Sequence, residues 1–468
     1  MQIFRVIGQM SKAVSNLGTD AGTNKVSEGL GDYVIRVVNS PLELDANQWN
    51  ALLAAQDNAN LFMRHEYLAA MTTTGCAVPD TGWTPCFVTI WQDADLAAAC
   101  ALYVKTHSYG EYVFDWAWAN AYQQHGLDYY PKAVVGSPFS PVPGARLLAR
   151  NAQERLLLAQ ALVEVCKQQK LSSLHILLGN QADQIAGESA GFMQRNTVQF
   201  HWTNADPHAL PLRGSLPQHG GESDASRGLG ANFGLAAFRE PLGGPAENCH
   251  SEFKTFANFL DGLAQEKRKK IRAERRKVLE AGVVFRWARG ADISAGDWDF
   301  FYRCYERTYL EHGNAPYLSR AFFKQVASSL PESWLLFVGE VAGQPIAASL
   351  IGLDPVAKVA YGRYWGALKR VDCLHFEACY YQPLQWCIEH GFVRFEGGAQ
   401  GEHKMARALL PVKTVSSHWL AHPSFADAVE RFLEREGDGI THYVDDLNQR
   451  SPFRKNNNNP DLNPNASS

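Results

Sequence analysis

Hydrophobic and polar positions follow the same order in two successive halves of the chain. In residues 84–179, apolar runs predict three strands, then a helix over 149–170 and a buried strand. In residues 333–398, similar runs predict three strands, a helix over 374–391 and another strand. Finding this order twice favours a duplicated α/β (α+β) domain over two unrelated mixed domains.

Three polar stretches lack a hydrophobic period and divide the chain. They predict this organisation: a flexible leader at 1–32, a first domain at 33–203, a low-complexity insertion or linker at 204–250, a basic helical segment at 251–282, a second domain at 283–453 and a disordered tail at 454–468.

The basic segment keeps helical spacing of apolar residues from Phe253 to Val278, which predicts one continuous helix. Between Glu266 and Lys277 it carries eight Lys or Arg against two Glu. Like charges repel on a helix unless an anion offsets them, so a phosphate-rich ligand such as RNA or a nucleotide-linked donor is one interpretation. A solvated face or a docking surface is the other. The phosphate-binding candidates are Lys267, Arg268, Lys270, Arg272, Arg275 and Arg276.

Composition narrows the class of protein without identifying it. The chain has 468 residues and a net charge of -4, so its overall charge does not favour binding to a polyanion. Any polyanionic partner would have to bind a local basic patch. The nine cysteines contain no CxxC pair, which is typical of reduced thiols and predicts no metal site. No apolar run reaches the roughly 20 residues of a membrane span, and the N-terminus lacks a signal-peptide core. We therefore expect a cytoplasmic protein without an integral membrane segment.

Several polar clusters fall on the predicted strands and helices. A strand over 107–118 would place Glu111 and Asp115 on one face. There they could act as a base, form a cradle for an amine or be a solvated acidic edge. The segment AYGRYWG groups an arginine with aromatic residues, which can hold a carboxylate or phosphate or simply stack. The helix over 374–391 begins with a histidine and a glutamate. The substrate-binding candidates here are Glu111, Asp115, Tyr361, Arg363, Tyr364, His375 and Glu377.

The segment FEGGAQGEHK has the densest reactive chemistry, directly after a strand. Glycines at 397 and 398 allow a sharp turn and close approach of backbone amides to a ligand. A carboxylate or imidazole could take a proton from an attacking amine, and a lysine or the amides could stabilise an oxyanion. The alternative is a glycine turn with solvated charges. The catalytic candidates are Glu396, Glu402, His403 and Lys404, with Gly397, Gly398 and Gln400 binding substrate.

The segments SYGEYVFDWAWANAY, KRKKIRAERR, YGRYWG, LHFEACYYQ, FEGGAQGEHK and PVKTVSSHW occur in this order. In this the chain resembles bacterial Fem-like, peptidoglycan-biosynthesis-type N-acyltransferases over about residues 33–455. The resemblance implies two tandem GNAT-like domains with a protruding basic helix. It also implies transfer of an acyl or aminoacyl group to a primary amine, such as one of a cell-wall precursor.

The resemblance leaves the substrates open. The donor would be a co-substrate, aminoacyl-tRNA or acyl-CoA, with no tightly bound cofactor. The chain has an insertion near 206–247. Its second half lacks the Q/RxxGxG/A loop that grips acetyl-CoA, which argues modestly against plain acetyl-CoA chemistry and leaves room for a larger phosphate-bearing donor. Two alternatives stay open: a non-catalytic protein that binds RNA or a cell-wall fragment, and an acetyl-CoA-dependent N-acetyltransferase.

Overall fold

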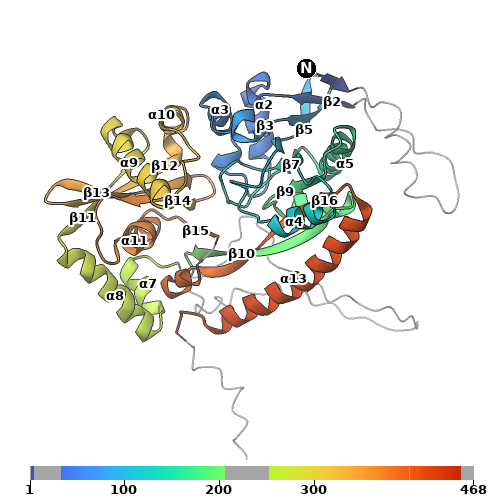
Figure 1. Cartoon of the computed structure of the whole chain (residues 1–468). Helices are drawn as coiled ribbons and strands as arrows, with labels where there is room; N and C mark the ends of the chain where they lie inside the picture. The colour runs from blue at the N-terminus through green and yellow to red at the C-terminus, as the bar shows by residue number, and fades with distance from the viewer. Residues whose placement is uncertain (1, 5–32, 206–251, 400, 455–468) are drawn as a thin grey trace, which may run out of the picture.

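The structure is a computed structural model that describes residues 2–4, 33–205, 252–399 and 401–454 (Figure 1). Most of the leader, nearly all of the 204–250 insertion and the tail lie outside these ranges. Of the predicted leader, residues Gln2–Phe4 form strand β1, which pairs with β2.

The first half divides its strands between a 5-stranded sheet and an 11-stranded sheet, and the helix predicted over 149–170 is confirmed as α5, with α4 and β7 preceding it. Its main elements in chain order are β2 (Tyr33–Val38), α2 (Ala46–Ala54), α3 (His65–Thr73), β3 (Trp83–Pro85), β4 (Phe87–Gln92), β5 (Asp95–Cys100), β6 (Leu102–Lys105), α4 (Trp116–Gln124), β7 (Lys132–Val135), β8 (Leu148–Ala149), α5 (Ala152–Gln168), β9 (Ser173–Ile176) and α6 (Gln181–Ser189).

The second half repeats this order, and its three strands, helix and following strand are confirmed. Its elements are β11 (Val283–Arg289), α9 (Ala295–Glu311), α10 (Arg320–Ser329), β12 (Trp334–Val341), β13 (Gln344–Asp354), β14 (Val359–Ala367), α11 (Leu374–Phe376), a π-helical turn (Glu377–Tyr381), α12 (Gln382–Glu389) and β15 (Arg394–Ala399). In both halves the neighbouring strands are antiparallel except one central pair, β7–β9 and β14–β15, which is parallel. The chain therefore contains two tandem GNAT-like domains.

The two domains exchange their last strands. Strand β10 (Met193–Thr203) follows the first domain in sequence but pairs with β15, and β16 (Leu410–Leu420) follows the second domain but pairs with β9. Because β10 and β16 also pair with each other, one 11-stranded sheet runs through both domains. The contiguous boundaries 33–203 and 283–453 therefore assign β10 and β16 each to the domain that precedes it in sequence, whereas β10 pairs with β15 of the second domain and β16 with β9 of the first.

One predicted strand is wrong. Residues 108–115 form a loop and α4 begins at Trp116. Backbone at Gly110 (φ 81°) and Tyr112 (φ 61°) is left-handed, which no strand permits. The loop turns inward because its carboxylates meet buried lysines.

The domains share a core. Helices α3 and α10 bring Tyr67 of the first domain edge-on to Phe322 of the second, at 5.3 Å between ring centroids. A second core lies under α12, and a third lies under α5 in the first domain. Because the central core draws on both domains, we expect them to fold and move together.

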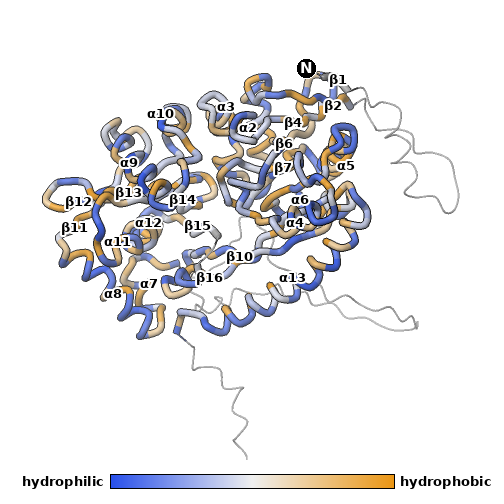
Figure 2. The backbone as a smooth tube through the Cα atoms, viewed as in Figure 1, coloured by the Kyte–Doolittle hydropathy of each residue, from blue (hydrophilic) through white to orange (hydrophobic). Residues whose placement is uncertain are grey.

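The basic segment contains two helices, α7 (Phe256–Gly262) and α8 (Gln265–Glu280), rather than one. They separate where Leu263 forms a β-bridge with Phe453. Helix α13 (Pro423–Gln449) runs along the same side of the molecule, and Figure 2 shows both α8 and α13 with long hydrophilic stretches. In the described ranges, no helix combines the length and apolar character needed to cross a bilayer.

Candidate functional site

The parallel strands β14 and β15 separate after a short stretch of pairing and open a cleft. Their paired residues run from Val359 to Tyr361 on β14 and from Arg394 to Glu396 on β15. Beyond this point lies a cavity of about 670 Å³. Its lining includes Tyr112, Tyr305, Tyr309, Arg363, Tyr364, Trp365, His375, Tyr380, Gly397 and Lys404.

The equivalent position in the first domain is filled by its own chain. The segments after β7 and β9 stay side by side, since the amide of Gly144 donates to the carbonyl of Leu178 at 3.0 Å. Arg146 is buried there, and its Nε donates to the carbonyl of Leu177 at 2.8 Å. The duplication therefore gives two similar domains, of which the second has the open cleft between its parallel strands.

A β-bulge places Arg363 in the cleft wall. Leu350 pairs with Tyr364 and Ile351 pairs with Gly362, so Arg363 is the extra residue of β14. Bulges redirect side chains next to active sites. Here Nη2 of Arg363 donates to the carbonyl of Phe139 in the first domain, at 2.8 Å.

Two different constraints favour glycine in β15: close packing at 397 and a left-handed backbone at 398. A Cβ at Gly397 would lie 2.4 Å from Leu409 Cδ2 and 2.9 Å from the carbonyl oxygen of Phe200. Gly398 has a left-handed φ of 76°, next to a register shift between β15 and β10. Gln400 lies outside the described residues.

Lys404 brings a buried amine to the cleft. Its Nζ donates to the carbonyl of Gly398 at 3.1 Å, and only 5% of the residue is exposed. Burial lowers the pKa of Lys404 to about 8, because desolvation disfavours the ammonium form. At neutral pH the cleft therefore holds a cation that can readily lose its proton.

His375 lines the cleft beside Trp365, with ring centroids 5.2 Å apart. Burial, with smaller effects from nearby cations, lowers the pKa of His375 to about 4, so its ring is neutral near pH 7. Tyr380 follows in the π-helical turn, and its hydroxyl hydrogen-bonds with Nε2 of His403 at 3.2 Å. Such π-helical turns are frequent at functional sites. His403 itself is exposed at the surface.

Other candidates from the sequence lie outside the cleft lining. Glu377 is buried and binds Arg275 instead, at 3.0 Å. Glu402 is exposed and accepts a hydrogen bond from Tyr443 of α13 at 2.9 Å. Alternation separates neighbours in a strand, so Glu396 points away from the cleft side on which Phe395 and Gly397 lie.

Glu396 is nevertheless unusual. Burial raises its pKa to about 7, and Arg394 forms an ion pair with it at 3.0 Å. Its strand neighbour Tyr361 packs edge-on against Phe62 of the first domain, with centroids 5.5 Å apart. Tyr361 therefore belongs to the contact between domains, and Glu396 lies beside it on the neighbouring strand.

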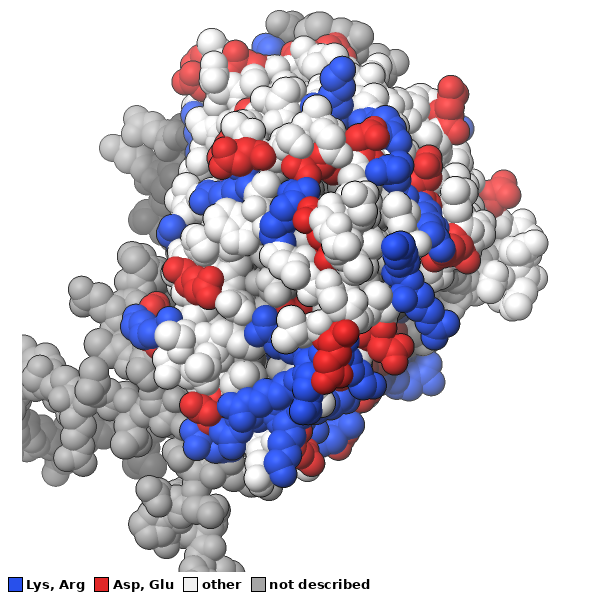
Figure 3. All heavy atoms as spheres, turned by 90° about the vertical axis from the view of Figure 1, so that its left-hand side faces the viewer, with Lys and Arg blue, Asp and Glu red and all other residues white. Residues whose placement is uncertain are grey.

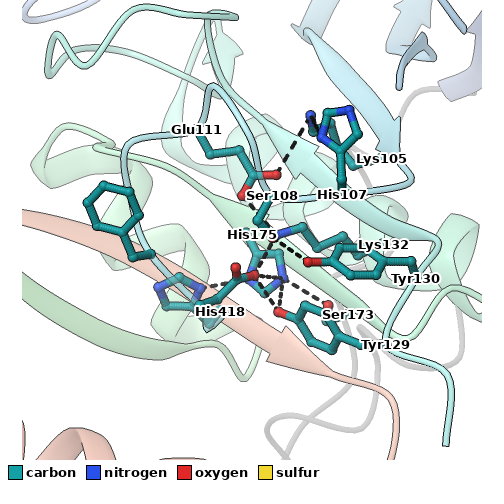
Figure 4. Close-up of polar contacts among 12 residues, drawn as sticks. Lys105, His107, Ser108, Glu111, Tyr129, Tyr130, Lys132, Ser173, His175 and His418 are labelled. Carbon is teal, nitrogen blue, oxygen red and sulfur yellow. Dashed lines mark hydrogen bonds and ion pairs between the residues drawn. The ribbon is translucent and has the colours of Figure 1, made fainter. Parts of the chain in front are cut away.

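Glu111 and Asp115 form neither an exposed face nor an amine cradle. They are buried in a charged network of the first domain, centred on Lys132 (Figure 4). Nζ of Lys132 donates to Glu111 at 2.8 Å and also to Asp115. The opposite charge of Lys132 holds the pKa of Asp115 well below its usual range, against the effect of burial. This network fixes the loop that carries Tyr112 to the cleft.

Helix α8 presents most of its basic residues to solvent. Figure 3 views the molecule from the left-hand side of Figure 1 and shows Lys and Arg gathered in its lower part. Arg275 forms an ion pair with Glu377. Lys267 pairs with the exposed Glu266, and Arg268 pairs with the exposed Asp261. Lys270, Arg272 and Arg276 have no ion pair within the described chain. We call these three residues the basic triad of α8.

Tyr364 of the cleft was predicted from the sequence, but Tyr112, Tyr305 and Tyr309 were missed. Tyr305 and Tyr309 come from α9, together with Thr308 and His312. Their spacing of three, four and seven residues places them on one helical face, which was the available signal. No sequence signal pointed to Tyr112, because its side chain reaches the cleft only through the left-handed loop.

Comparison with known families gives one match. The FemAB-like family model, described as peptidoglycan biosynthesis/recognition, matches residues 40–209 and 247–455. A search of curated proteins finds no match.

Several solved structures are similar in outline. FemX is 9% identical, with 84% of this chain and 100% of that chain covered and a TM-score of 0.47. L-PGS from Bacillus licheniformis is 11% identical, with 84% and 98% covered and a TM-score of 0.45. A tandem GNAT protein from the clavulanic acid biosynthesis pathway is 11% identical, with 83% and 99% covered and a TM-score of 0.40.

Proposed function

Because this chain belongs to the FemAB-like family, we propose that it is an N-acyltransferase whose active site is the β14–β15 cleft. In the proposed reaction a primary amine attacks the carbonyl carbon of an activated acyl or aminoacyl donor. A C–N bond forms, the ester or thioester bond of the donor breaks, and the proton of the amine leaves to a base. The buried Lys404 beside the glycine bulge is the observation that carries this proposal.

Lys404 would stabilise the oxyanion. Carbonyl attack places negative charge on oxygen, and a positioned cation in a site shielded from water stabilises that charge strongly. Lys404 is held at Gly398 in the cleft wall, where such an oxygen would meet its ammonium group. Holding donor and amine together in a cavity of this size would supply a further part of the rate by proximity.

The proton would leave through Tyr380 and His403. Tyr380 lines the cleft and hydrogen-bonds with His403, which is exposed. This chain of groups connects the cleft with solvent. Between the two bases suggested by the sequence, the geometry favours His403 over Glu402, because Glu402 is bound to Tyr443 at the surface.

The donor would carry phosphates that bind the basic triad of α8. The positive charge of Lys270 contributes to lowering the pKa of His403, after burial and two nearer cations, so α8 lies within electrostatic reach of the cleft entrance. Aminoacyl-tRNA and acyl-CoA both carry phosphates. An amine of a cell-wall precursor, met in the cytoplasm, is the proposed acceptor.

The test offers the purified chain charged tRNA and acetyl-CoA in parallel, each with a pool of primary amines, and follows transfer by mass spectrometry. We expect new amides that form with wild type and form much more slowly with Lys404→Met. Transfer from acetyl-CoA alone would contradict the proposal of a larger donor. No transfer from either donor would contradict the proposal that the protein is an enzyme.

A second candidate, an RNA-binding protein without catalysis, is favoured by one observation, the solvent-facing basic triad. Nucleic acid that copurifies and is stripped by salt, together with no transfer from any donor, would support it.

A further inference from the structure

Arg363 is a partly buried cation without a counter-ion in the described chain. Its Nη2 donates to the carbonyl of Phe139 and, at 3.2 Å, to the hydroxyl of Tyr364. Its Nε is buried without a hydrogen-bond partner. No carboxylate of the described chain forms an ion pair with it. The buried Nε is therefore left without a partner in the wall of the cleft.

The surrounding rings do not supply a negative charge. The guanidinium carbon lies 5.1 Å from the ring centroid of Phe62 and 4.9 Å from that of Tyr364. Burial raises the pKa of Tyr112 well above its usual value, so this hydroxyl is neutral and can only donate or accept hydrogen bonds. Aromatic faces attract a guanidinium, but they compensate its charge only weakly. A partly buried charge whose Nε lacks a hydrogen-bond partner is costly unless a ligand supplies the missing negative charge.

We propose that Arg363 binds a carboxylate of the amine acceptor, so that the enzyme prefers acceptors that carry both an amine and a carboxylate. This inference rests on the proposed function and adds the substrate class. A single guanidinium compensates one negative charge, which matches a carboxylate better than a doubly charged phosphate. Hydroxyls of Tyr112 and Tyr309, which line the same cleft, can donate to the second carboxylate oxygen.

The carboxylate belongs to the acceptor for a chemical reason. In an activated donor the reacting carbonyl is already an ester or thioester, so that group cannot be the carboxylate which Arg363 binds. The basic triad of α8 serves phosphates at the side of His403. Arg363 instead contacts the first domain through Phe139. Donor and acceptor would thus be recognised by different cations.

The test uses two matched pairs of amines that differ only in a carboxylate or a carboxamide. The pairs are Nα-acetyl-L-lysine with Nα-acetyl-L-lysinamide, and 6-aminohexanoate with 6-aminohexanamide. Binding to the full chain is measured by calorimetry without a donor, and transfer is then measured with the donor that the first test selects. Inorganic phosphate is a third ligand in the binding arm.

We expect the carboxylates to bind more tightly than the carboxamides, and Arg363→Gln to weaken them by about 10- to 100-fold, as for loss of a hydrogen bond to a charged group. The KM for the carboxylate acceptor should rise while kcat changes little. Arg363→Lys keeps the charge and should restore part of the affinity. Arg370→Gln, an exposed residue just after β14, is the matched control and should leave binding unchanged.

Equal binding of acid and amide, no binding of either carboxylate, or binding of phosphate alone would overturn the inference. If Arg363→Gln does not fold, the acid–amide difference in wild type and the Arg363→Lys variant still decide it. Carboxylate binding that depends on Arg363 without any transfer would leave the subsite standing and remove the proposed reaction. Equal transfer to the carboxylate and carboxamide acceptors would support the proposed reaction and contradict the carboxylate subsite.

Discussion

Arg407 directs Nη2 at both carboxylate oxygens of Glu274, at 2.9 and 2.8 Å, and so ties the segment that carries Lys404 to helix α8. The Glu274 carboxylate also accepts the hydroxyl of Tyr381. The guanidinium carbon of Arg407 lies 3.4 Å from the ring centroid of Phe376. The cleft and the basic helix are therefore held together by one buried ion pair.

Glu274→Gln should lower the free energy of unfolding by about 3 kcal/mol, because it leaves Arg407 buried without its counter-ion. Urea unfolding followed by tryptophan fluorescence measures this. Glu280→Gln, at the exposed end of α8, is the control and should change stability by less than about 0.5 kcal/mol. The double variant Glu274→Gln/Arg407→Met should recover part of the loss. A single variant as stable as wild type would contradict the structural role of the pair.

Lys404→Met should reduce transfer by roughly 100- to 1000-fold, the usual cost of losing one oxyanion-stabilising group. Methionine keeps an apolar stem of similar length without the charge, so the fold should survive. Lys404→Arg retains a cation and should lose less of the transfer rate. Single-turnover transfer rates of the variants, measured by mass spectrometry, test this prediction. A Lys404→Met enzyme at wild-type rate would remove Lys404 from the mechanism.

The same lysine predicts a pH dependence. Its pKa falls from 10.5 to about 8 in the folded chain, so above pH 8 the cleft loses its cation and transfer should decline. Between pH 8 and 10.5 the unfolded chain binds the proton that the folded chain has released, so this residue makes stability rise with pH in that window. Lys404→Met should lack this contribution, which is measured as the difference between unfolding curves at pH 7.5 and 10. An identical pH profile in both proteins would refute the shifted pKa.

Gly397→Ala should disrupt the cleft, because the new methyl group would meet Leu409 and the backbone of Phe200 at impossible distances. Overpacking of this kind costs about 1–3 kcal/mol, and β15 must shift to relieve it. Gly439→Ala, in α13 with nothing within 4 Å, is the matched control and should be neutral or stabilise by up to about 1 kcal/mol. Thermal unfolding and transfer assays compare the two. Equal stability of the two variants would show that β15 yields freely.

Lys132→Met should be among the most destabilising single changes in the first domain, by about 3 kcal/mol or more, because Glu111 and Asp115 would stay buried without their shared cation. It should also raise the KM for the acceptor, since the loop carrying Tyr112 loses its anchor. Lys167→Met, which breaks only an exposed pair with Glu164, is the control. Neutralising Glu111 and Asp115 in the same chain should restore part of the stability. If Lys132→Met unfolds like the control, the network is not an anchor.

Replacing the basic triad of α8 (Lys270, Arg272 and Arg276) by alanine should weaken a phosphate-bearing donor. The slope of log Kd against log salt should become shallower by about 2, from three lost phosphate contacts on a single strand. Filter binding with charged tRNA across a salt series measures it. Arg431→Ala/Arg435→Ala on the exposed side of α13 is the control. An unchanged salt slope would exclude α8 as the donor surface.

Pattern alone determined the duplication, the three strands of the second domain and the position of α5 and β15. These features depend on local periodicity, which a strand or helix imposes on its own sequence. The reactive segment after β15 was found in the same way, because glycines and charged residues stand out after an apolar strand. The loop that carries Glu111 defeated this reasoning, since alternation there mimics a strand whereas Lys132, from a later strand, draws the carboxylates inward.

Only the tertiary structure decided which of these residues meet. The sequence could not distinguish Glu402 from Lys404, two residues apart in one short helical turn, although one faces α13 and the other faces the cleft. Nor could it show that the last strands are exchanged, because either partner offers β10 the same hydrogen bonds. The cleft depends on long-range packing: a bulge aims Arg363 at the first domain, and a loop of that domain supplies Tyr112. Local patterns fix the elements of this protein, and contacts between distant segments fix its site.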